Sequence, residues 1–199
     1  MLSPKRKISA AIFDFDGTLV DTMPIHYRAY REVFASYGVE LAFDHFVAVI
    51  GGKASETIPR MAGRALDAAT VAEIHLKKKQ QVRVLFTTEE IVCLRTSILL
   101  DLVRGRMPVA LASAGSREGI QIILARLGWD NAFDVLICGE DVANGKPAPD
   151  AFLSAARSLN VNPSECLVFE DTTAGITAAK RAGMSCVDVR EGLALPLTV

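Results

Sequence analysis

The sequence has little of several features that would assign a function directly. Its 199 residues carry a formal net charge of −1, which provides no long-range field for nucleic acid or an anionic membrane. Its two dense basic runs, Lys5–Lys7 and Lys77–Lys79, are typical of a solvated chain end and a solvated helix face. No apolar run approaches the ~20 residues needed to span a bilayer, and the first ten residues contain too little apolar sequence for a secretory signal. We therefore expect a cytoplasmic protein that binds neither nucleic acid nor membrane.

Cysteine and histidine patterns are equally sparse. No Cys-x-x-Cys pair occurs, and the three histidines do not fall at zinc-ligand spacing with the cysteines, so a zinc site is not favoured. We expect the cysteines to be small buried side chains. The residues concerned are Cys93, Cys138, Cys166, Cys186, His26, His45 and His75. A P-loop and a Gly-x-Gly-x-x-Gly motif are also missing, which removes the two commonest sequence signatures of nucleotide binding.

The chain does have the pattern of an α/β fold. Half of its residues are apolar, enough for one substantial core and a smaller insert. After about residue 105, short β-branched runs alternate with helix-period stretches, which predicts a parallel sheet covered by helices. The expected strands are Ala10–Phe13, Val109–Ala112, Val135–Cys138, Leu167–Phe169 and Ser185–Asp188. The expected helices are Ser116–Leu127, Pro149 to about Leu159, and Thr173–Ala182. Between Thr22 and about Arg95 helical periodicity dominates, which indicates a helical insert.

Two carboxylates follow the first expected strand, in the run Asp14-Phe15-Asp16-Gly17-Thr18. Residues i and i+2 of an extended segment project to the same side, so Asp14 and Asp16 are expected side by side. Adjacent anions raise each other's pKa unless a cation or a shared proton compensates, which suggests a metal site or acid/base chemistry. Taken alone, the run is more typical of a β-turn with solvated carboxylates. The partners elsewhere in the chain decide between the two.

Polar residues follow three further strands. Ser113 and Ala114 come after one, Lys146 follows another in Asn144-Gly145-Lys146-Pro147, and Glu170-Asp171 ends a third. Alone, Ser113 would cap the next helix, Lys146 would lie on the surface and Glu170-Asp171 would serve a helix N-terminus. Ligands of parallel α/β sheets, however, bind at the carboxyl ends of the strands. Together these groups offer what phosphoryl transfer needs: carboxylates for magnesium, and a hydroxyl, amides and a lysine for phosphate.

Four motifs in this order resemble those of the haloacid dehalogenase superfamily. The first matches Asp14-Phe15-Asp16-Gly17-Thr18, the second Ser113, the third Lys146, and the fourth Glu170-Asp171 with Gly175. Within the superfamily the chain is most similar to the β-phosphoglucomutase-like sugar-phosphate phosphatases. The resemblance implies a Rossmann-like parallel core, residues 1–21 and 96–199, with an inserted α-helical cap, residues 22–95.

The resemblance also implies roles for the residues of the core. Asp14 is expected to be the nucleophile that forms an aspartyl-phosphate, and Asp16 the general acid/base. Ser113, Ala114 and Lys146 are expected to bind the phosphate.

The cofactor that the resemblance implies is Mg²⁺. Its expected ligands are Asp14, the backbone carbonyl of Asp16, Asp171, and Glu170 either directly or through water.

The expected cap would exclude water and contact the organic part of the substrate. Candidate residues are Thr22, His26, Lys53 and Ser55; a histidine on a helix can equally be a packing residue. Ser55 stands where the phosphoglucomutase has an arginine for a second phosphate, which favours a simple phosphatase. The run Ile91–Thr96 departs from the family's usual return from cap to core.

We therefore expect a Mg²⁺-dependent phosphatase of a small phosphorylated metabolite, of the fructose-1-phosphate or 6-phosphogluconate type. The substrate would be its only partner, and the resembling family members lead us to expect a monomer. One alternative is a β-phosphoglucomutase-like phosphotransferase. Another is a non-catalytic sugar-phosphate binding protein, which would be marked by loss of Asp14 or Asp16, and both are present.

Overall fold

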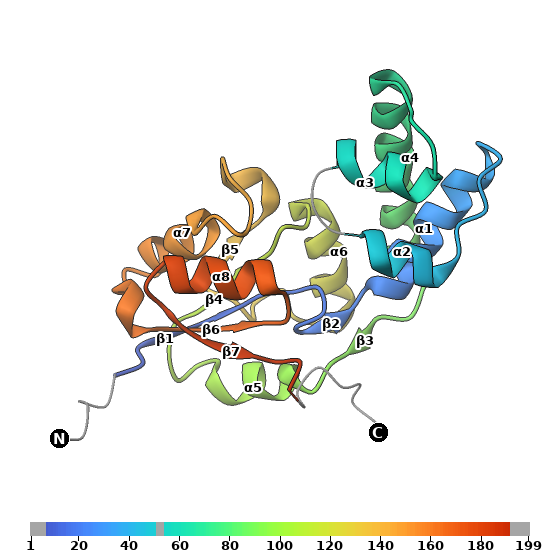
Figure 1. Ribbon diagram of the computed structural model, residues 1–199. Helices are drawn as coiled ribbons and strands as arrows, with labels where there is room; N and C mark the ends of the chain where they lie inside the picture. The colour runs from blue at the N-terminus through green and yellow to red at the C-terminus, as the bar shows by residue number, and fades with distance from the viewer. Residues whose placement is uncertain (1–6, 51–53, 192–199) are drawn as a thin grey trace. The chain divides into compact units, whose positions relative to one another are not determined.

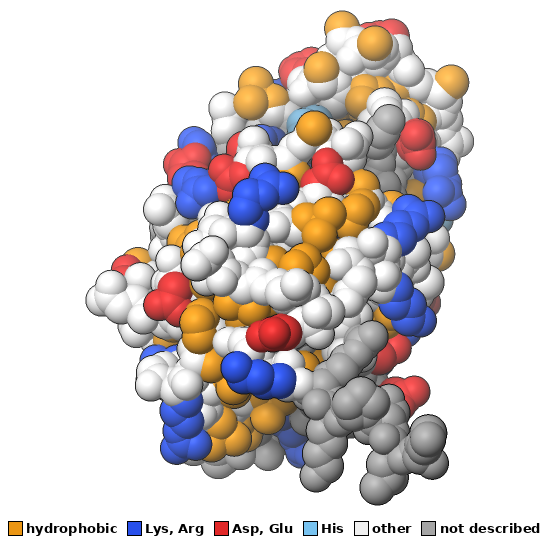
Figure 2. Space-filling model, turned by 90° about the vertical axis from the view of Figure 1, so that its left-hand side faces the viewer, with side chains coloured by type: hydrophobic (Ala, Val, Ile, Leu, Met, Phe, Trp, Pro, Cys, Tyr) orange, Lys and Arg blue, Asp and Glu red, His pale blue; other side chains and the backbone are white. Residues whose placement is uncertain are grey.

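The computed structural model describes residues 7–50 and 54–191 and separates into two compact units (Figure 1). The core unit comprises Met1–Thr22 and Ile91–Val199, and the insert unit comprises Met23–Glu90. Among the described helices, none is both long enough and apolar enough to cross a bilayer. On the face drawn in Figure 2, basic and acidic side chains of the described residues lie interspersed, so the near-neutral charge is also mixed locally.

A five-stranded parallel sheet forms the centre of the core unit, in the order β5-β4-β1-β6-β7. The strands are β1 (Ala10–Phe13), β4 (Val109–Ala112), β5 (Val135–Ile137), β6 (Cys166–Glu170) and β7 (Ser185–Asp188). β1 is central and its side chains are at most 2% exposed, which explains its uninterrupted apolar sequence. The predicted α/β fold class is confirmed.

Alternate residues of the central strands face helices α7 (Asp150–Ser158) and α8 (Thr173–Arg181). Ala10 and Ile12 of β1 pack in one cluster with the alanines of these two helices. The period of two along the strand places these side chains on the same face. Small alanine side chains let the helices approach the sheet closely.

The chemistry of the helix ends matches the sequence pattern. Helix α6 (Arg117–Leu127) begins after Ser116, whose hydroxyl accepts a hydrogen bond from the Gly119 amide at 3.3 Å. It ends at Gly128, where φ is +66°, a conformation that glycine adopts without strain. Short 3₁₀ turns η1 (Gly139–Asp141) and η2 (Pro163–Glu165) complete the connections.

A two-stranded antiparallel ribbon lies where the chain leaves and re-enters the core unit. It pairs β2 (Val20–Asp21) with β3 (Val92–Cys93) and is followed by α5 (Thr96–Val103). Val92 and Cys93 fall within the range expected for the cap, but their pairing with β2 places them in the core unit. The insert unit therefore ends at Glu90.

The insert unit is helical and has its own core. Its helices are α1 (Met23–Ala35), α2 (Phe43–Val49), α3 (Ala54–Ala62) and α4 (Ala68–Thr88). Aromatic rings of α1 and α2, including Tyr30, Phe34 and Phe46, pack with aliphatic side chains of α3 and α4. Arg28 of α1 pairs with Glu89 just after α4, which joins the first and last helices of the unit.

Candidate active site

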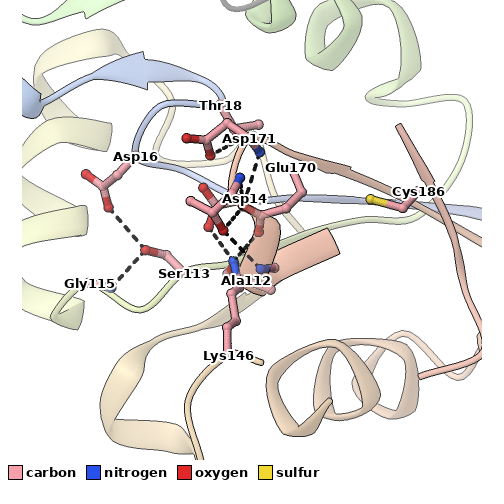
Figure 3. A network of polar contacts seen from close by, with 12 residues as sticks. Asp14, Asp16, Thr18, Ala112, Ser113, Gly115, Lys146, Glu170, Asp171 and Cys186 are labelled. Atoms are coloured by element: carbon pink, nitrogen blue, oxygen red, sulfur yellow. Dashed lines mark hydrogen bonds and ion pairs between the residues drawn. The ribbon is translucent and has the colours of Figure 1, made fainter. Parts of the chain in front are cut away.

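The carboxyl ends of the three central strands bring the chemically active side chains together (Figure 3). Asp14 follows β1, Ser113 follows β4 and Glu170 is the last residue of β6. Since β1 lies between β4 and β6 in the sheet, these groups meet although they are distant in sequence. Asp14 is only 6% exposed, so its carboxylate is almost fully withdrawn from water.

Lys146 is the basic group of the site and reaches it from the loop between η1 and α7. Its Nζ donates to Asp14 Oδ1 at 2.5 Å, to Glu170 Oε2 at 2.7 Å and to the Ala112 carbonyl at 3.1 Å. These bonds match the three donors of an ammonium group. Burial by itself lowers the pKa of Lys146, but the two carboxylates more than offset this effect and raise it. Lys146 is therefore held as a charged ammonium beside Asp14.

Glu170 is fully buried and both of its oxygens are engaged. Oε2 accepts from Lys146, and Oε1 accepts from the amides of Asp171 and Thr172 at 3.1 and 2.8 Å and from the Thr172 hydroxyl at 2.8 Å. A Cβ on Gly175 would lie 1.9 Å from Oε2. Gly175 therefore provides the space in which Glu170 lies, which explains why the fourth motif has a glycine at this position.

An acidic cluster of Asp14, Glu170 and Asp171 can present one ligand atom each within 4.8 Å of one another. Burial raises the pKa of Asp14 well above its usual value, and Glu170 and Asp171 add to the effect while Lys146 opposes it. Burial, and next Glu170, raise the pKa of Asp171 to about 6. The Lys146 ammonium offsets only one of these three charges. The donor set of hard oxygens and excess negative charge therefore fits a divalent cation such as Mg²⁺.

Asp16 lies beside this cluster with its carboxylate directed elsewhere. Its Oδ1 accepts from the Thr22 hydroxyl at 2.6 Å, and its Oδ2 from the Ser113 hydroxyl at 3.3 Å. In Figure 3 Asp16 points toward Ser113, whereas Asp14 points toward Lys146. The structure thus brings Thr22 to the general acid/base candidate rather than to an open substrate surface.

The loop expected to receive phosphate is packed against the loop after β5. The Ser113 hydroxyl accepts from the Gly115 amide at 2.9 Å, and the Gly115 carbonyl accepts from the Gly139 amide at 2.9 Å. A Cβ on Gly139 would lie 2.6 Å from the Ala114 carbonyl. Ala114 itself is exposed, so its backbone is accessible to a ligand. The sequence analysis did not identify Gly139 as part of the site.

For the candidate residues of the insert unit, the structure describes fewer contacts. His26 of α1 is half-buried, and its Nδ1 lies 3.2 Å from Lys78 Nζ of α4. Ser55 is exposed in the first turn of α3, and Lys53 lies outside the described residues.

The structure adds Lys78 to these candidates, although the run Lys77–Lys79 predicts a solvated helix face. Lys78 is half-buried, whereas Lys77 and Lys79 are exposed. The helical period of α4 does predict the burial of residue 78, because it lies four positions after Ile74 and four before Val82, both of which are buried.

The fold and this group of residues define a class of protein. Residues 11–189 match the family of haloacid dehalogenase-like hydrolases, and the chain belongs to that family. The family prediction is therefore confirmed.

Individual relatives narrow the comparison. Fructose-1-phosphate phosphatase YqaB of Escherichia coli is 34% identical over 190 residues, covering 92% of this chain and 97% of that protein. A phosphorylated carbohydrates phosphatase of Thermotoga maritima is 36% identical over 184 residues, covering 89% and 82%. The crystal structure of β-phosphoglucomutase from Clostridium difficile matches with a TM-score of 0.74 at 29% identity, covering 90% and 83%. The predicted enzyme class, a phosphoric monoester hydrolase, agrees with the names of the two relatives.

Proposed function

We propose that this protein is a Mg²⁺-dependent phosphatase that hydrolyses a small sugar phosphate by way of a phosphoryl group on Asp14. The observation that carries the proposal is the buried Asp14 carboxylate, which pairs with Lys146. It lies in a cluster of three carboxylates whose negative charge exceeds the single positive charge of Lys146. A carboxylate nucleophile divides a difficult hydrolysis into two easier displacements.

In the first displacement an oxygen of Asp14 attacks phosphorus, and the bond from phosphorus to the sugar oxygen breaks. Asp16 gives its proton to the departing alcohol. Lys146, the Ser113 hydroxyl and the Ala114 amide neutralise the charge on the phosphoryl oxygens. Since Asp16 is bonded to Thr22 and Ser113 in this structure, its carboxylate has to turn toward the leaving oxygen before it can act.

In the second displacement Asp16 takes a proton from water as that water attacks the phosphorus of the aspartyl-phosphate. The bond from phosphorus to Asp14 breaks, which releases inorganic phosphate and restores the Asp14 carboxylate and the protonated Asp16.

Asp14, Asp171 and the backbone carbonyl of Asp16 would hold Mg²⁺, which when bound supplies positive charge opposite the phosphoryl oxygens. Glu170 lies within the acidic cluster, but its oxygens already serve Lys146, Thr172 and the backbone. We therefore assign Glu170 chiefly to holding Lys146, with any contact to the ion made through water.

The names of the two relatives support a phosphorylated carbohydrate such as fructose 1-phosphate as substrate. A substrate of the 6-phosphogluconate type stays a prediction from the sequence alone. In the insert unit, the candidates for contacting the sugar are His26, Lys53 and Ser55. Lys78 joins them because its Nζ lies 3.2 Å from His26 Nδ1. The similarity to β-phosphoglucomutase favours one alternative, a phosphotransferase that returns the phosphoryl group to a sugar. The serine at position 55 opposes it, because a hydroxyl offers no charge to a second phosphate.

The test is release of inorganic phosphate from a panel of sugar phosphates, with Mg²⁺ and with chelator, alongside Asp14→Asn. We expect metal-dependent release that Asp14→Asn reduces by at least ~10³-fold, as for loss of a nucleophile. No release from any compound, followed by sugar isomerisation when a sugar bisphosphate is added, would establish the mutase instead. Sugar-phosphate binding without either reaction would indicate a binding protein.

A further inference from the structure

The turn that follows β1 lies directly against Asp171. Gly17 has φ +85° and its amide donates to the Val20 carbonyl at 2.8 Å, while the amide of Leu19 donates to Phe15. This tight turn brings Thr18, which is fully buried, to the acidic cluster.

Both carboxylate oxygens of Asp171 lie against residues of this turn. The Thr18 hydroxyl donates to Asp171 Oδ1 at 3.0 Å. A Cβ on Gly17 would lie 2.3 Å from Asp171 Oδ2, so that oxygen lies where a side chain of residue 17 would otherwise be. Gly17 leaves the space for the Asp171 carboxylate. The Thr18 hydroxyl, which lies beside Asp171 in Figure 3, fixes the rotation of that carboxylate.

We propose that Thr18 is a positioning residue that sets the metal affinity of the site through its hydrogen bond to Asp171. This inference rests on the proposed metal-dependent function. Asp171 follows Glu170, and repulsion between two neighbouring carboxylates favours rotation of the less constrained one. Glu170 is held by several donors, so Asp171 is the carboxylate that needs a restraint.

The identity of residue 18 fits this role. A β-branched side chain has few χ1 rotamers, and a buried hydroxyl needs a partner, which Asp171 supplies. Valine has nearly the shape of threonine without the donor, whereas serine keeps the donor and loses the methyl group. The two substitutions separate the hydrogen bond from the packing.

The experiment measures Mn²⁺ binding by electron paramagnetic resonance of the free ion for wild type, Thr18→Val, Thr18→Ser and Asp171→Asn. Second-sphere partners of metal ligands are typically worth 10–100-fold in affinity, so we expect Thr18→Val to weaken binding by about tenfold or more. Thr18→Ser should stay within about threefold of wild type, because the donor remains. The matched control is Thr96→Val in α5, an equally buried threonine of the core unit, which should leave metal affinity unchanged.

Urea unfolding in chelator separates positioning from stability. A merely structural threonine would lower the free energy of unfolding in Thr18→Val and leave the Mn²⁺ affinity at the wild-type value, which would overturn the inference. If Asp171→Asn loses binding while Thr18→Val keeps it, the inference fails and the proposed metal site stands. If wild type does not bind Mn²⁺, or Asp171→Asn binds as wild type does, the proposed metal site itself fails.

Discussion

At the scale of single residues, the acidic cluster links metal binding to pH. Burial and Glu170 raise the pKa of Asp171 to about 6 in the metal-free protein, so a proton competes with the cation below that pH. We expect metal affinity to fall as the pH is lowered through about 6, by up to about tenfold per pH unit for the proton taken up by Asp171. Mn²⁺ titrations between pH 5 and pH 8 measure this, and equal dissociation constants at both ends would contradict it.

The same raised pKa has a consequence for the stability of the metal-free protein. Between the ordinary value of 3.8 and about 6, the folded protein holds a proton on Asp171 that the unfolded chain has released. The contribution of this group therefore becomes less favourable as the pH rises through that window. An aspartate paired with a cation usually shows the opposite pH dependence, because its ionisation stabilises the folded protein.

Lys78 offers a matched pair of variants in the insert unit. Lys78→Met removes the half-buried ammonium beside His26, whereas Lys79→Met removes an exposed neighbour of the same charge. Since we propose that Lys78 contacts the substrate, we expect kcat/KM of Lys78→Met to fall by roughly tenfold or more, because a hydrogen bond to a charged group is worth about 1.5–3 kcal/mol. Steady-state kinetics should show Lys79→Met near wild type. Equal effects of the two variants would rule out a specific role for Lys78.

At the scale of elements, the start of helix α8 and the end of strand β6 fit together only because residue 175 has no side chain. Gly175→Ala would place a Cβ 1.9 Å from Glu170 Oε2 and displace a buried charge from its partners. We expect a loss of about 2–4 kcal/mol in the free energy of unfolding, measured by urea denaturation. The control is Gly145→Ala, where an added Cβ meets nothing within 4 Å. A loss no larger than that of the control would contradict this account.

The loops after β4 and β5 depend on a second glycine. Gly139→Ala would place a Cβ 2.6 Å from the Ala114 carbonyl, so the expected phosphate loop has to shift. We expect phosphate, measured as a product inhibitor, to bind roughly tenfold more weakly, because small displacements of positioned groups are costly. The Gly145→Ala control should keep wild-type inhibition. Unchanged inhibition in Gly139→Ala would show that this loop does not hold phosphate.

Strands that form apolar runs of four residues could be predicted from the sequence, whereas strands of two residues could not. The apolar runs at Ala10–Phe13, Val109–Ala112 and Ser185–Asp188 have the strand bounds that the structure has. The ribbon of β2 and β3 was missed because strands of two residues contain no period. Since β3 determines where the chain returns to the core unit, the expected boundary at 95 lies beyond Glu90.

The sequence pattern predicted which side chains come together at this edge of the sheet, but not the direction in which each of them points; their roles stay predictions. The strand ends identified Asp14, Lys146 and Glu170, which the structure brings together. Sequence spacing alone suggested that Asp16 would stand beside Asp14, but hydrogen bonds from Thr22 and Ser113 direct it away. The direction of Asp16 depends on a turn that brings Thr22 back to it and on Ser113, which is distant in the chain, and spacing encodes neither contact.

At the scale of the whole molecule, the two compact units should respond differently to metal. The acidic cluster lies entirely within the core unit. Bound at a concentration of 100 times its dissociation constant, a ligand stabilises the folded state by about 2.7 kcal/mol, roughly 5–10 °C in Tm for a chain of this size. Scanning calorimetry should show Mg²⁺ raising the transition of the core unit. Asp171→Asn should show no shift, and a shift as large as in wild type would place the metal elsewhere.

The ribbon of β2 and β3 also affects the entropy of folding. The insert unit separates β1 from β4 in the sequence, although these strands pair in the sheet. Its ends leave the core unit beside the paired residues Asp21 and Val92. While the insert is unfolded, pairing β1 with β4 closes a long flexible loop, whose entropic cost grows with the logarithm of its length. Once the insert is folded with its ends adjacent, the same pairing closes a much shorter effective loop. Folding of the helical insert therefore lowers the entropic cost of pairing β1 with β4, relative to the same pairing with the insert unfolded.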